Sequence, residues 1–481
     1  MVSIGACGAP GPGSNPGFDP LIINYYFLKK ALVFIYYYKL NKYRKRENMV
    51  EKMILETAKG FRDFAPEEKI LRDKIIFKIK NIFENYGFSP LETPTVEKLE
   101  ILEAKFGAGE NSDAISEIYR FKDQGERSLG LRYEFTFALA RFIGENPQIR
   151  LPFKRYQIGP VFRDGPIKAG RYREYYQCDV DIIGVKEVSS DSEIISLIDF
   201  VFKELNLEVN IEINDRRLLE EILDFYKINK EIQTSVIITI DKLKKTGFEG
   251  VKNELYSKGL DEKTIDLLLN LLLVSGTNQE KLEAIGKTIG ETEGIKSLQE
   301  LFKYLEYYDV SYMFLPSLAR GLGYYTGPIF EVFLKDKKIM SSSIAGGGRW
   351  DEMISKYLQD DSKSYPAVGV AFGLEPIMEI IKKRDGMDKK TTADLFVIPI
   401  GDTIKDSIKI VQKLRMNGMN VSIDLLKRSI GKNIEYADKL GITYVGFLGE
   451  NEIKEKIISI KNIKTGKEDK ISFENITFLS F

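Results

Sequence analysis

The hydrophobic residues change their spacing several times along the chain, and the first clear helical spacing covers residues 66–86. Its apolar residues recur every three or four positions, at Leu71, Ile75, Ile79, Ile82, Phe83 and Tyr86. This spacing predicts an amphipathic helix. Pro66 suits the first turn of the helix, and Gly87 suits its end. Residues 89–94 then predict an extended strand, which its prolines confine to a sheet edge or an interface.

Short apolar runs between turn residues predict antiparallel strands within residues 117–184, with a helix near 135–144. Residues 216–306 are rich in Lys, Glu and Leu at helical spacing, which predicts an inserted helical domain. The elements expected after this domain are strands at 323–334 and 366–372 and a helix at 375–384.

From residue 393 onward, short apolar strands alternate with helices. The expected strands cover 395–400, 420–423 and 444–448, and the expected helices cover 403–417 and 430–440. Gly418 and Gly441 suit the two helix ends. The alternation predicts a small α/β domain with a mostly parallel or mixed sheet.

The composition is that of a globular chain with more than one domain. A length of 481 residues is too great for one hydrophobic core, so we expect two to four domains. Hydrophobic residues make up 43% and charged residues 30%, as in soluble proteins. The 71 basic and 71 acidic residues cancel, which argues against a protein that coats nucleic acid through bulk charge.

The chain contains no histidine and two cysteines, Cys7 and Cys178. This excludes a Cys/His zinc site within the chain and also Ser–His and Cys–His catalysis. Two cysteines make no disulfide framework, which favours a reducing compartment. The chemistry therefore falls to carboxylates, arginines, tyrosines, backbone amides or groups of the substrate itself.

Residues 1–48 differ from the rest of the chain. They begin with a Gly/Pro-rich stretch, and the apolar residues that follow are interrupted by Lys29 and Lys30. The uninterrupted runs are too short to span a bilayer, and we expect no membrane segment. Our hypothesis is a start codon assigned too early, with Met49 or Met53 as the true start; the alternative is a disordered tail.

The first stretch with candidate chemistry covers residues 131–136 and 155–184. On a strand, alternate side chains share one face. Here one face would carry Arg171, Arg173, Tyr175, Gln177, Asp179 and Asp181. Interleaved arginines and carboxylates indicate a bound zwitterion or phosphate ester, because guanidinium binds phosphate through paired hydrogen bonds. The alternative is an exposed face of paired charges.

Two glycine-rich stretches are further candidates. Residues 319–327 place three glycines around an arginine and two tyrosines, which lets a ligand approach the backbone closely. Residues 345–351 hold three consecutive glycines and could form a phosphate-binding loop, although they lack the Lys-Ser/Thr ending of a P-loop. The alternative for this second stretch is a flexible hairpin.

In this order, the stretches resemble the histidyl-tRNA synthetase family from about Leu55 to the end of the chain. The segments that carry the resemblance are 57–63 (opening signature), 86–94 (motif 1, the dimer-interface strand), 132–136 and 170–181 (the variant typical of archaeal and eukaryotic members, including motif 2), 320–327 (the family-specific stretch), 366–375 (motif 3) and 436–441 (anticodon-binding domain). Motif 2 and the family-specific stretch together are highly specific.

The resemblance implies an α+β fold, in which helices flank the antiparallel sheet of class II synthetases. It adds a helical insertion and a C-terminal α/β anticodon-binding domain. The expected boundaries are 1–48 for the extension, 49–215 for the catalytic domain with motifs 1 and 2, 216–306 for the insertion, 307–385 for the rest of the catalytic domain, 386–391 for a linker and 392–481 for the anticodon-binding domain.

The resemblance also implies an enzyme that activates L-histidine with ATP and transfers it to tRNA(His). The implied catalytic residues are Arg163 and Arg320, which would hold the α-phosphate. The implied histidine contacts are Glu134, Thr136 and Gln177 at the α-amino group, and Asp181 and Tyr325, with neighbouring Tyr324, at the imidazole. The other expected ATP contacts are Arg171 near the γ-phosphate, Tyr175 on adenine, Glu375 and Arg349.

Three residues depart from the family pattern, and one of them, Tyr133 before Glu134 where bacterial members have proline, only marks the subgroup. Gly323 replaces a common aspartate, and Pro376 stands where motif 3 usually has an arginine that binds the γ-phosphate. Proline is tolerated in the first turn of a helix, so the fold should survive. We expect a raised KM for ATP, with Arg349 or Arg171 as candidates to supply the missing charge.

The expected partners are L-histidine, ATP with Mg²⁺, and tRNA(His), in the cytoplasm. We expect no metal site made of Cys or His side chains. The expected assembly is a homodimer through motif 1. Lys427, Arg428 and Lys432 are candidates for RNA backbone contacts, with a solvated helix start as the alternative. One rival function is a regulatory subunit of ATP phosphoribosyltransferase, and another is an RNA-binding or sensor protein with a decayed active site.

Overall fold

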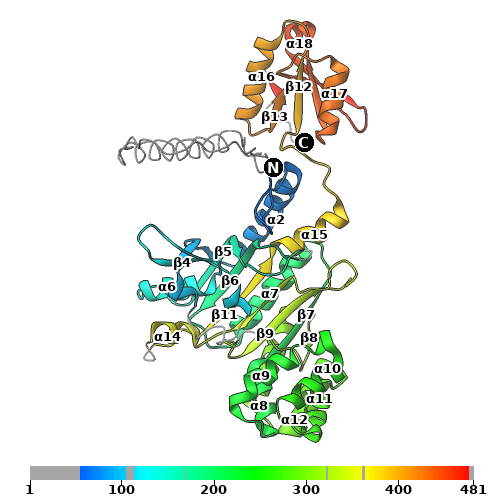
Figure 1. The fold of residues 1–481 in the computed structure, drawn as a ribbon. Coiled ribbons are helices and arrows are strands. Elements are labelled where there is room, and N and C mark those ends of the chain that lie inside the picture. The colour runs from blue at the N-terminus through cyan, green and yellow to red at the C-terminus, as the bar shows by residue number, and fades with distance from the viewer. Residues whose placement is uncertain (1–54, 104–112, 168–169, 321–322, 360–362, 476–481) are drawn as a thin grey trace, which may run out of the picture. The chain divides into compact units, whose positions relative to one another are not determined.

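The computed structural model describes residues 55–103, 113–167, 170–320, 323–359 and 363–475 (Figure 1). The segment expected at 1–48 lies outside these residues. Within the described ranges, every helix is too short or too polar to cross a membrane.

The first expected helix is present as α2, Pro66–Asn85, and its prediction is confirmed. Its buried apolar residues are Ile75, Ile79, Ile82 and Phe83. The helix packs against α7, Ser189–Glu204, and both helices belong to the core that covers one face of the central sheet. Gly87 follows with a φ of +77°, a conformation that residues with a side chain disfavour.

The centre of the fold is an eight-stranded sheet in the order β1-β5-β6-β11-β10-β9-β7-β8 (Figure 1). Its strands, in chain order, are β1 Ser89–Pro90, β5 Phe153–Phe162, β6 Glu174–Ile183, β7 Val209–Asp215, β8 Met313–Phe314, β9 Pro328–Leu334, β10 Ala345–Arg349 and β11 Ala367–Gly373. Neighbouring strands are antiparallel except at the two edges, where β1 pairs with β5 and β8 with β7 in parallel. The expected antiparallel class II sheet is confirmed.

The two faces of this sheet have different roles. On β6, Cys178, Val180 and Ile182 belong to the core with α2, α7 and α15, which is Leu374–Asp385. The alternate residues therefore project from the opposite face. A smaller sheet and short helices complete this part of the fold: β2 Val96–Lys98, β3 Arg120–Lys122, β4 Ser128–Leu131, α3 Leu99–Leu102, α5 Asp113–Ser116, α6 Thr136–Glu145 and α14 Met353–Leu358.

Three local predictions need correction. The extended segment expected at 89–94 is a strand only at Ser89–Pro90, on the sheet edge where proline costs no ladder bond. The strand expected from residue 323 begins at Pro328. The glycine run Ala345–Arg349 is neither a phosphate-binding loop nor a hairpin, because it is an interior strand paired with both β9 and β11.

Six helices occupy the region between β7 and β8, beside that edge of the sheet (Figure 1). They are α8 Arg216–Phe225, α9 Lys230–Ile240, α10 Leu243–Ser257, α11 Glu262–Leu272, α12 Asn278–Ile289 and α13 Glu293–Tyr307. Side chains of Asp215, Asn229, Asp261, Thr277 and Thr292 accept backbone hydrogen bonds at five of the N-termini. The prediction of a helical region is confirmed.

The C-terminal part has a five-stranded mixed sheet in the order β13-β12-β14-β15-β16. Its elements are β12 Leu395–Pro399, α16 Ile404–Met416, β13 Val421–Ile423, α17 Ile430–Lys439, β14 Tyr444–Leu448, α18 Glu450–Glu455, β15 Ile457–Asn462 and β16 Glu468–Ser472. The first three strands are parallel, and the last two add antiparallel pairs. The α/β prediction is confirmed, whereas β15 and β16 were not foreseen.

Candidate active site

A pocket lies on the face of the central sheet that α2 and α7 leave uncovered. It has about 500 Å³ of empty space including its open mouth. All four side chains expected to meet there line it: Arg163, Arg320, Asp181 and Tyr325. The pocket also takes in Glu134, Thr136, Gln177 and Tyr324. The structure therefore brings together every residue that the resemblance implied for histidine and for the α-phosphate.

Strand β6 supplies the polar floor of the pocket, because Gln177, Asp179 and Asp181 alternate on one face. The neighbouring strand β11 places the small residues Gly373, Ala371 and Gly369 opposite them. Small neighbours leave room for a ligand above the strand.

Asp181 is held by an arginine on the neighbouring strand. Arg155 lies opposite Asp181 on β5, is fully buried, and has Nη2 2.5 Å from Asp181 Oδ2. A buried ion pair needs such close geometry to offset its lost hydration. The pairing fixes a carboxylate at the deep end of the pocket.

Burial shifts the pKa values of the pocket carboxyls upward. Desolvation raises the pKa of Glu134 to about 7 and that of Asp181 to about 6. Burial is also the largest cause of the raised pKa of Asp179, with Asp181 and Glu134 adding repulsion and Arg155 opposing it. Burial in the pocket therefore disfavours the ionised form of these carboxyls, and a bound cation would favour that form again.

Arg320 lies along the strand of glycines. Its Nη1 donates to the Phe330 carbonyl at 3.2 Å and lies 3.4 Å from Glu331 Oε1, and its guanidinium carbon is 5.5 Å from the Tyr325 ring centre. A β-carbon at Gly346 would overlap Arg320 Nη1. The glycine thus leaves room for this placement of the guanidinium, which would otherwise have to shift.

Arg163 enters the pocket from the end of β5. Its Nε donates to the Tyr133 carbonyl at 3.3 Å, and its guanidinium carbon lies 5.5 Å from the ring centre of Tyr175. Arg163 and Arg320 thus reach one pocket from opposite sides of the sheet order. Two guanidinium groups that share a pocket with small floor residues are suited to an oxyanion.

The other residues expected at ATP lie outside the pocket lining. Arg171 is exposed and pairs with Glu117 at 3.3 Å. Glu375 is buried, pairs with Arg72 at 2.9 Å and accepts a hydrogen bond from the Tyr176 amide at 2.9 Å. Pro376 is the third residue of α15, so the helix tolerates it as expected.

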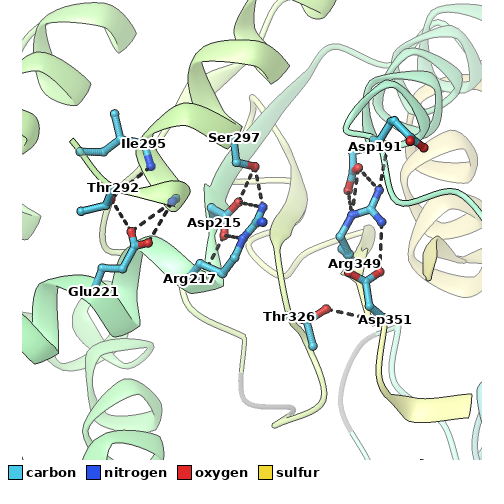
Figure 2. Close-up of polar contacts among 12 residues, drawn as sticks. Asp191, Asp215, Arg217, Glu221, Thr292, Ile295, Ser297, Thr326, Arg349 and Asp351 are labelled. Carbon is cyan, nitrogen blue, oxygen red and sulfur yellow. Dashed lines mark hydrogen bonds and ion pairs between the residues drawn. The ribbon is translucent and has the colours of Figure 1, made fainter. Parts of the chain in front are cut away.

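Arg349 is not brought to the pocket, in contrast to its expected role at ATP. Its guanidinium is buried and donates to Asp191, Asp351 and Ser190 and to the carbonyls of Val185 and Glu187. Figure 2 shows Arg349 between Asp191 and Asp351, with Thr326 bonded to Asp351. The donors of Arg349 are taken up within the chain, which favours a structural role over the expected contact with phosphate.

The Arg349 cluster supports the segment that carries the two pocket tyrosines. The Thr326 amide donates to the Arg349 carbonyl at 2.9 Å, and the Asp351 amide donates to Thr326 Oγ1 at 3.0 Å. The next residue, Gly327, accepts from the Arg216 amide at 2.8 Å. The segment after Tyr325 is therefore tied both to β10 and to the first helix of the inserted region.

The comparisons with known proteins agree with this geometry. A family model described as histidyl-tRNA synthetase matches residues 60–377, and one described as an anticodon-binding domain matches residues 394–477. The chain belongs to the histidyl-tRNA synthetase family. Histidine–tRNA ligase 1 of Bacillus cereus is 39% identical over 430 residues, which cover 88% of this chain and 99% of the relative. The histidine–tRNA ligase of Aeropyrum pernix is 36% identical over 416 residues, covering 85% and 94%.

Solved structures support the same fold. The histidyl-tRNA synthetase of Nostoc sp. PCC 7120 has a TM-score of 0.78 and 28% identity, covering 89% of this chain and all of that one. A Bacillus halodurans protein described as an ATP phosphoribosyltransferase regulatory subunit/histidyl-tRNA synthetase has a TM-score of 0.68 at 21% identity, which carries the fold alone. The family predicted from the motifs is confirmed.

Sequence reasoning did not assign several pocket residues. Asp179 was placed on the right strand face but given no role, and Trp350, Gly346 and Gly347 also line the pocket. Arg155, the partner of Asp181, gave no signal beyond its position opposite Asp181 in a strand hairpin. Strand pairing would have found Arg155, because the register follows once β5 and β6 are recognised as neighbours.

Proposed function

We propose that this chain, a histidine–tRNA ligase by its family, uses the pocket to form histidyl-adenylate from L-histidine and ATP and then charges tRNA(His). The observation that carries the proposal is the convergence of Arg163, Arg320, Asp181 and Tyr325 on one pocket. Two cationic groups suit a phosphate, and a carboxylate with a phenol suits a ring that has two nitrogens.

The histidine substrate would lie along β6. Glu134 and Gln177, with Thr136 beside them, bind the α-ammonium group, and Asp181 and Tyr325 bind the two imidazole nitrogens. Arg155 keeps Asp181 charged and correctly placed, while Tyr324 packs against Tyr325 with ring centres 4.7 Å apart. A site whose buried polar groups require both ring nitrogens discriminates by about 10⁴-fold or more against analogues that leave them unpaired.

In the first reaction a carboxylate oxygen of histidine attacks the α-phosphorus of ATP. A new P–O bond forms, the bond to the bridging oxygen of the β-phosphate breaks, and pyrophosphate leaves. The attacking group is already an anion, so no general base is needed and the absence of histidine from the chain is no obstacle. Arg163 and Arg320 stabilise the charge that builds on the α-phosphate, and rate acceleration rests on positioning and electrostatics.

ATP would extend from the pocket past the motif 2 strands. We propose that Tyr175 stacks on adenine and that Arg171 reaches the γ-phosphate, which requires Arg171 to leave Glu117. Glu375 acts indirectly, since it holds Arg72 and the Tyr176 amide. Pro376 offers no phosphate contact, so the affinity for ATP should be lower than in relatives with arginine there.

Mg²⁺ would enter with ATP. The described residues include no group of three Cys, Asp or Glu side chains arranged to hold a metal ion. We therefore propose that ATP oxygens provide most ligands and that Mg²⁺ neutralises phosphate charge. Pyrophosphate exchange that is independent of Mg²⁺ in the presence of a chelator would contradict this proposal.

For tRNA, we propose that the catalytic domain comprises 49–215 and 307–385, that the insertion of 216–306 contacts tRNA, and that 392–481, after the linker, reads the anticodon. The loop after β13 is a candidate contact, because Leu425 and Leu426 are strongly exposed there. Arg428 stacks on Tyr436 at 4.2 Å, which leaves Lys427 and Lys432 as freer cations. RNA loops are commonly read by such stacking and cationic side chains.

The finer assignments rest on the motifs. We propose a cytoplasmic homodimer that pairs through motif 1, and a member of the archaeal and eukaryotic-like variant, in which Tyr133 precedes Glu134. Sedimentation equilibrium tests the assembly, and a monomer at micromolar concentration would contradict it.

The decisive experiment is aminoacylation of total tRNA with labelled histidine, together with histidine-dependent pyrophosphate exchange. Activity in both assays is expected. Exchange without aminoacylation would indicate a failure of the proposed tRNA contacts, and absence of both would refute the proposed function. A variant without the insertion should lose tRNA charging more than adenylate formation; the reverse result would refute the tRNA role of the insertion.

A further inference from the structure

We infer that Asp179 is the third acceptor for the α-ammonium group of the amino acid, beside Glu134 and Gln177. This inference rests on the proposed function and deepens it, because it adds a specificity residue to the amino-acid subsite. It assigns a role to a pocket carboxyl that neither the motifs nor the proposed reaction uses.

Asp179 is buried in the pocket without a partner. Its side chain is 6% exposed and lines the same pocket as Glu134, Arg163 and Gln177. Its Oδ1 atom is buried and accepts no hydrogen bond from any residue that the structure describes. An unsatisfied buried acceptor costs about 1–3 kcal/mol, so its presence in a pocket points to a ligand that donates to it.

No neighbouring side chain that the structure describes donates a hydrogen bond to Asp179 Oδ1, although Nε and Nη1 of Arg155 are also without hydrogen bonds. Gln157 lies opposite Asp179 on β5, but its amide pairs with the Thr93 hydroxyl at 3.0 and 3.2 Å. Arg155 pairs with Asp181 at 2.5 Å. On the other side of Asp179, Ala371 of β11 offers no polar side chain. The donor for Asp179 therefore comes from the pocket itself.

The number of open acceptors matches an ammonium group. Within the described residues, four buried pocket oxygens lack a hydrogen bond: Glu134 Oε1, Gln177 Oε1, Asp179 Oδ1 and Asp181 Oδ2. Asp181 Oδ2 is ion-paired with Arg155, which leaves the other three open to a donor. An ammonium group has three N–H donors and no acceptor. The Thr136 side chain hydrogen-bonds with the Glu134 carboxyl. Thr136 therefore orients Glu134, and Asp179 takes the third place that the motifs gave to Thr136.

The position of Asp179 on β6 agrees with this role. It stands between Gln177, at the amino end of the subsite, and Asp181, which faces the ring. Residues two apart on a strand are about 7 Å apart and share one face, so the side chains of Asp179 and Asp181 can reach different groups of one ligand. Burial also raises the pKa of Asp179 well above its usual value, and a cation beside it would favour the ionised carboxylate.

The test compares three ligands that differ in one group. L-histidine carries the ammonium, the carboxylate and the ring; L-histidinol lacks the carboxylate; and 3-(imidazol-4-yl)propionate lacks the ammonium. Dissociation constants are measured by calorimetry on the full chain for wild type and Asp179→Asn. We expect histidine and histidinol to bind about 10- to 100-fold more weakly to the variant, and the propionate to change by less than about twofold.

Two variants calibrate the result. Glu134→Gln should give the same pattern, because it also acts on the ammonium. Asp199→Asn, which alters a carboxyl paired with Lys203 on α7, should change none of the three constants. Asp179→Ser repeats the test with a smaller side chain if the amide is not tolerated, and binding of the propionate reports that the pocket is intact.

Two outcomes with the Asp179→Asn variant would overturn the inference. Equal weakening of all three ligands would assign Asp179 to the ring or to the fold, and unchanged binding of histidine would remove it from the subsite. A wild-type chain that binds no histidine would instead refute the proposed function. Binding of histidine by wild type with an indifferent Asp179→Asn variant refutes the inference alone.

Discussion

Two buried polar regions next to the central sheet differ in how completely their polar atoms are hydrogen-bonded within the chain. Around Arg349, the donors of the guanidinium meet the carboxylates of Asp191 and Asp351 (Figure 2) and also a hydroxyl and carbonyls of the chain. In the pocket, which Gly346 and Gly347 of the same strand line, Glu134, Gln177, Asp179 and Arg320 keep buried polar atoms without hydrogen bonds among the described residues. Both regions are rich in charge. We call the Arg349 region closed, because the donors of its guanidinium are hydrogen-bonded within the chain, and the pocket open, because it keeps polar atoms without partners.

The difference teaches how to separate a scaffold from a site. A buried group that is fully satisfied gains nothing from a ligand, whereas an unsatisfied one keeps a desolvation cost that a complementary ligand removes. The motif containing Arg349 and the motif containing Arg320 look alike in sequence, since each joins arginine to glycines. Their surroundings favour a structural role for Arg349 and leave Arg320 available to a ligand.

The largest expected effect is on stability at the closed region. Arg349→Met leaves Asp191 buried without its cation and should lower the free energy of unfolding by about 3–5 kcal/mol. Urea denaturation measures this change. Arg127→Met, which breaks an exposed pair with Asp123, should cost at most about 1 kcal/mol. An Arg349→Met variant with unchanged stability and a raised KM for ATP would restore the phosphate role of Arg349.

The matching change in the open region should affect catalysis rather than the fold. Arg320→Gln keeps hydrogen-bonding capacity but removes the charge at the α-phosphate. It should lower kcat in pyrophosphate exchange by about 10²- to 10³-fold while leaving the urea midpoint nearly unchanged. A variant that loses stability but retains kcat would place Arg320 with Arg349 in the scaffold.

The pH dependence sharpens the comparison further. Burial raises the pKa of Glu134 to about 7, and the ionised form is the one that binds an ammonium. The value of kcat/KM for histidine should therefore fall by about tenfold per pH unit below 7. The contribution of this group to folding has the opposite sign: it is full below the unfolded pKa of about 4.3 and is lost as pH rises through 7.

Glu134→Gln provides the control for that profile. The step near pH 7 should disappear, leaving the titration of the imidazole of the substrate near its usual pKa of about 6.5. If wild type and variant share one profile, Glu134 does not control histidine binding.

The smallest effect is expected at Pro376. Pro376→Arg adds a cation in the first turn of α15 and should lower the KM for ATP by about two- to tenfold, with the KM for histidine unchanged. Steady-state pyrophosphate exchange at varied ATP measures it. An unchanged KM for ATP would mean that another group already serves the γ-phosphate.

Local patterns in the sequence predicted much of the fold. Helices α2 and α17 are examples, because their spacing of apolar residues and their end signals lie within the segment itself. The alternation on β6 also placed Gln177, Asp179 and Asp181 on one face before any pairing was known. Such features depend on neighbours within a few residues, where periodicity is informative.

The remaining features depend on distant partners. Arg349 meets Asp191, which lies 158 residues away in the chain, so its closed environment could not be inferred from the local motif. Strand β10 escaped prediction because glycines have no apolar side chains that could reveal a period. The hydrogen bond of Thr136 to Glu134 also had no signal in the sequence.

The glycine strand has a consequence for mutational tolerance. At Gly346 a methyl group would overlap the catalytic-site guanidinium, at Gly347 the backbone of Gly369, and at Gly369 the carboxylate of Asp181. In a library of single substitutions, inactive clones should therefore cluster at positions that contribute no functional group. The activity of this enzyme should therefore depend on the absence of side-chain atoms at these glycines as well as on the functional groups around them.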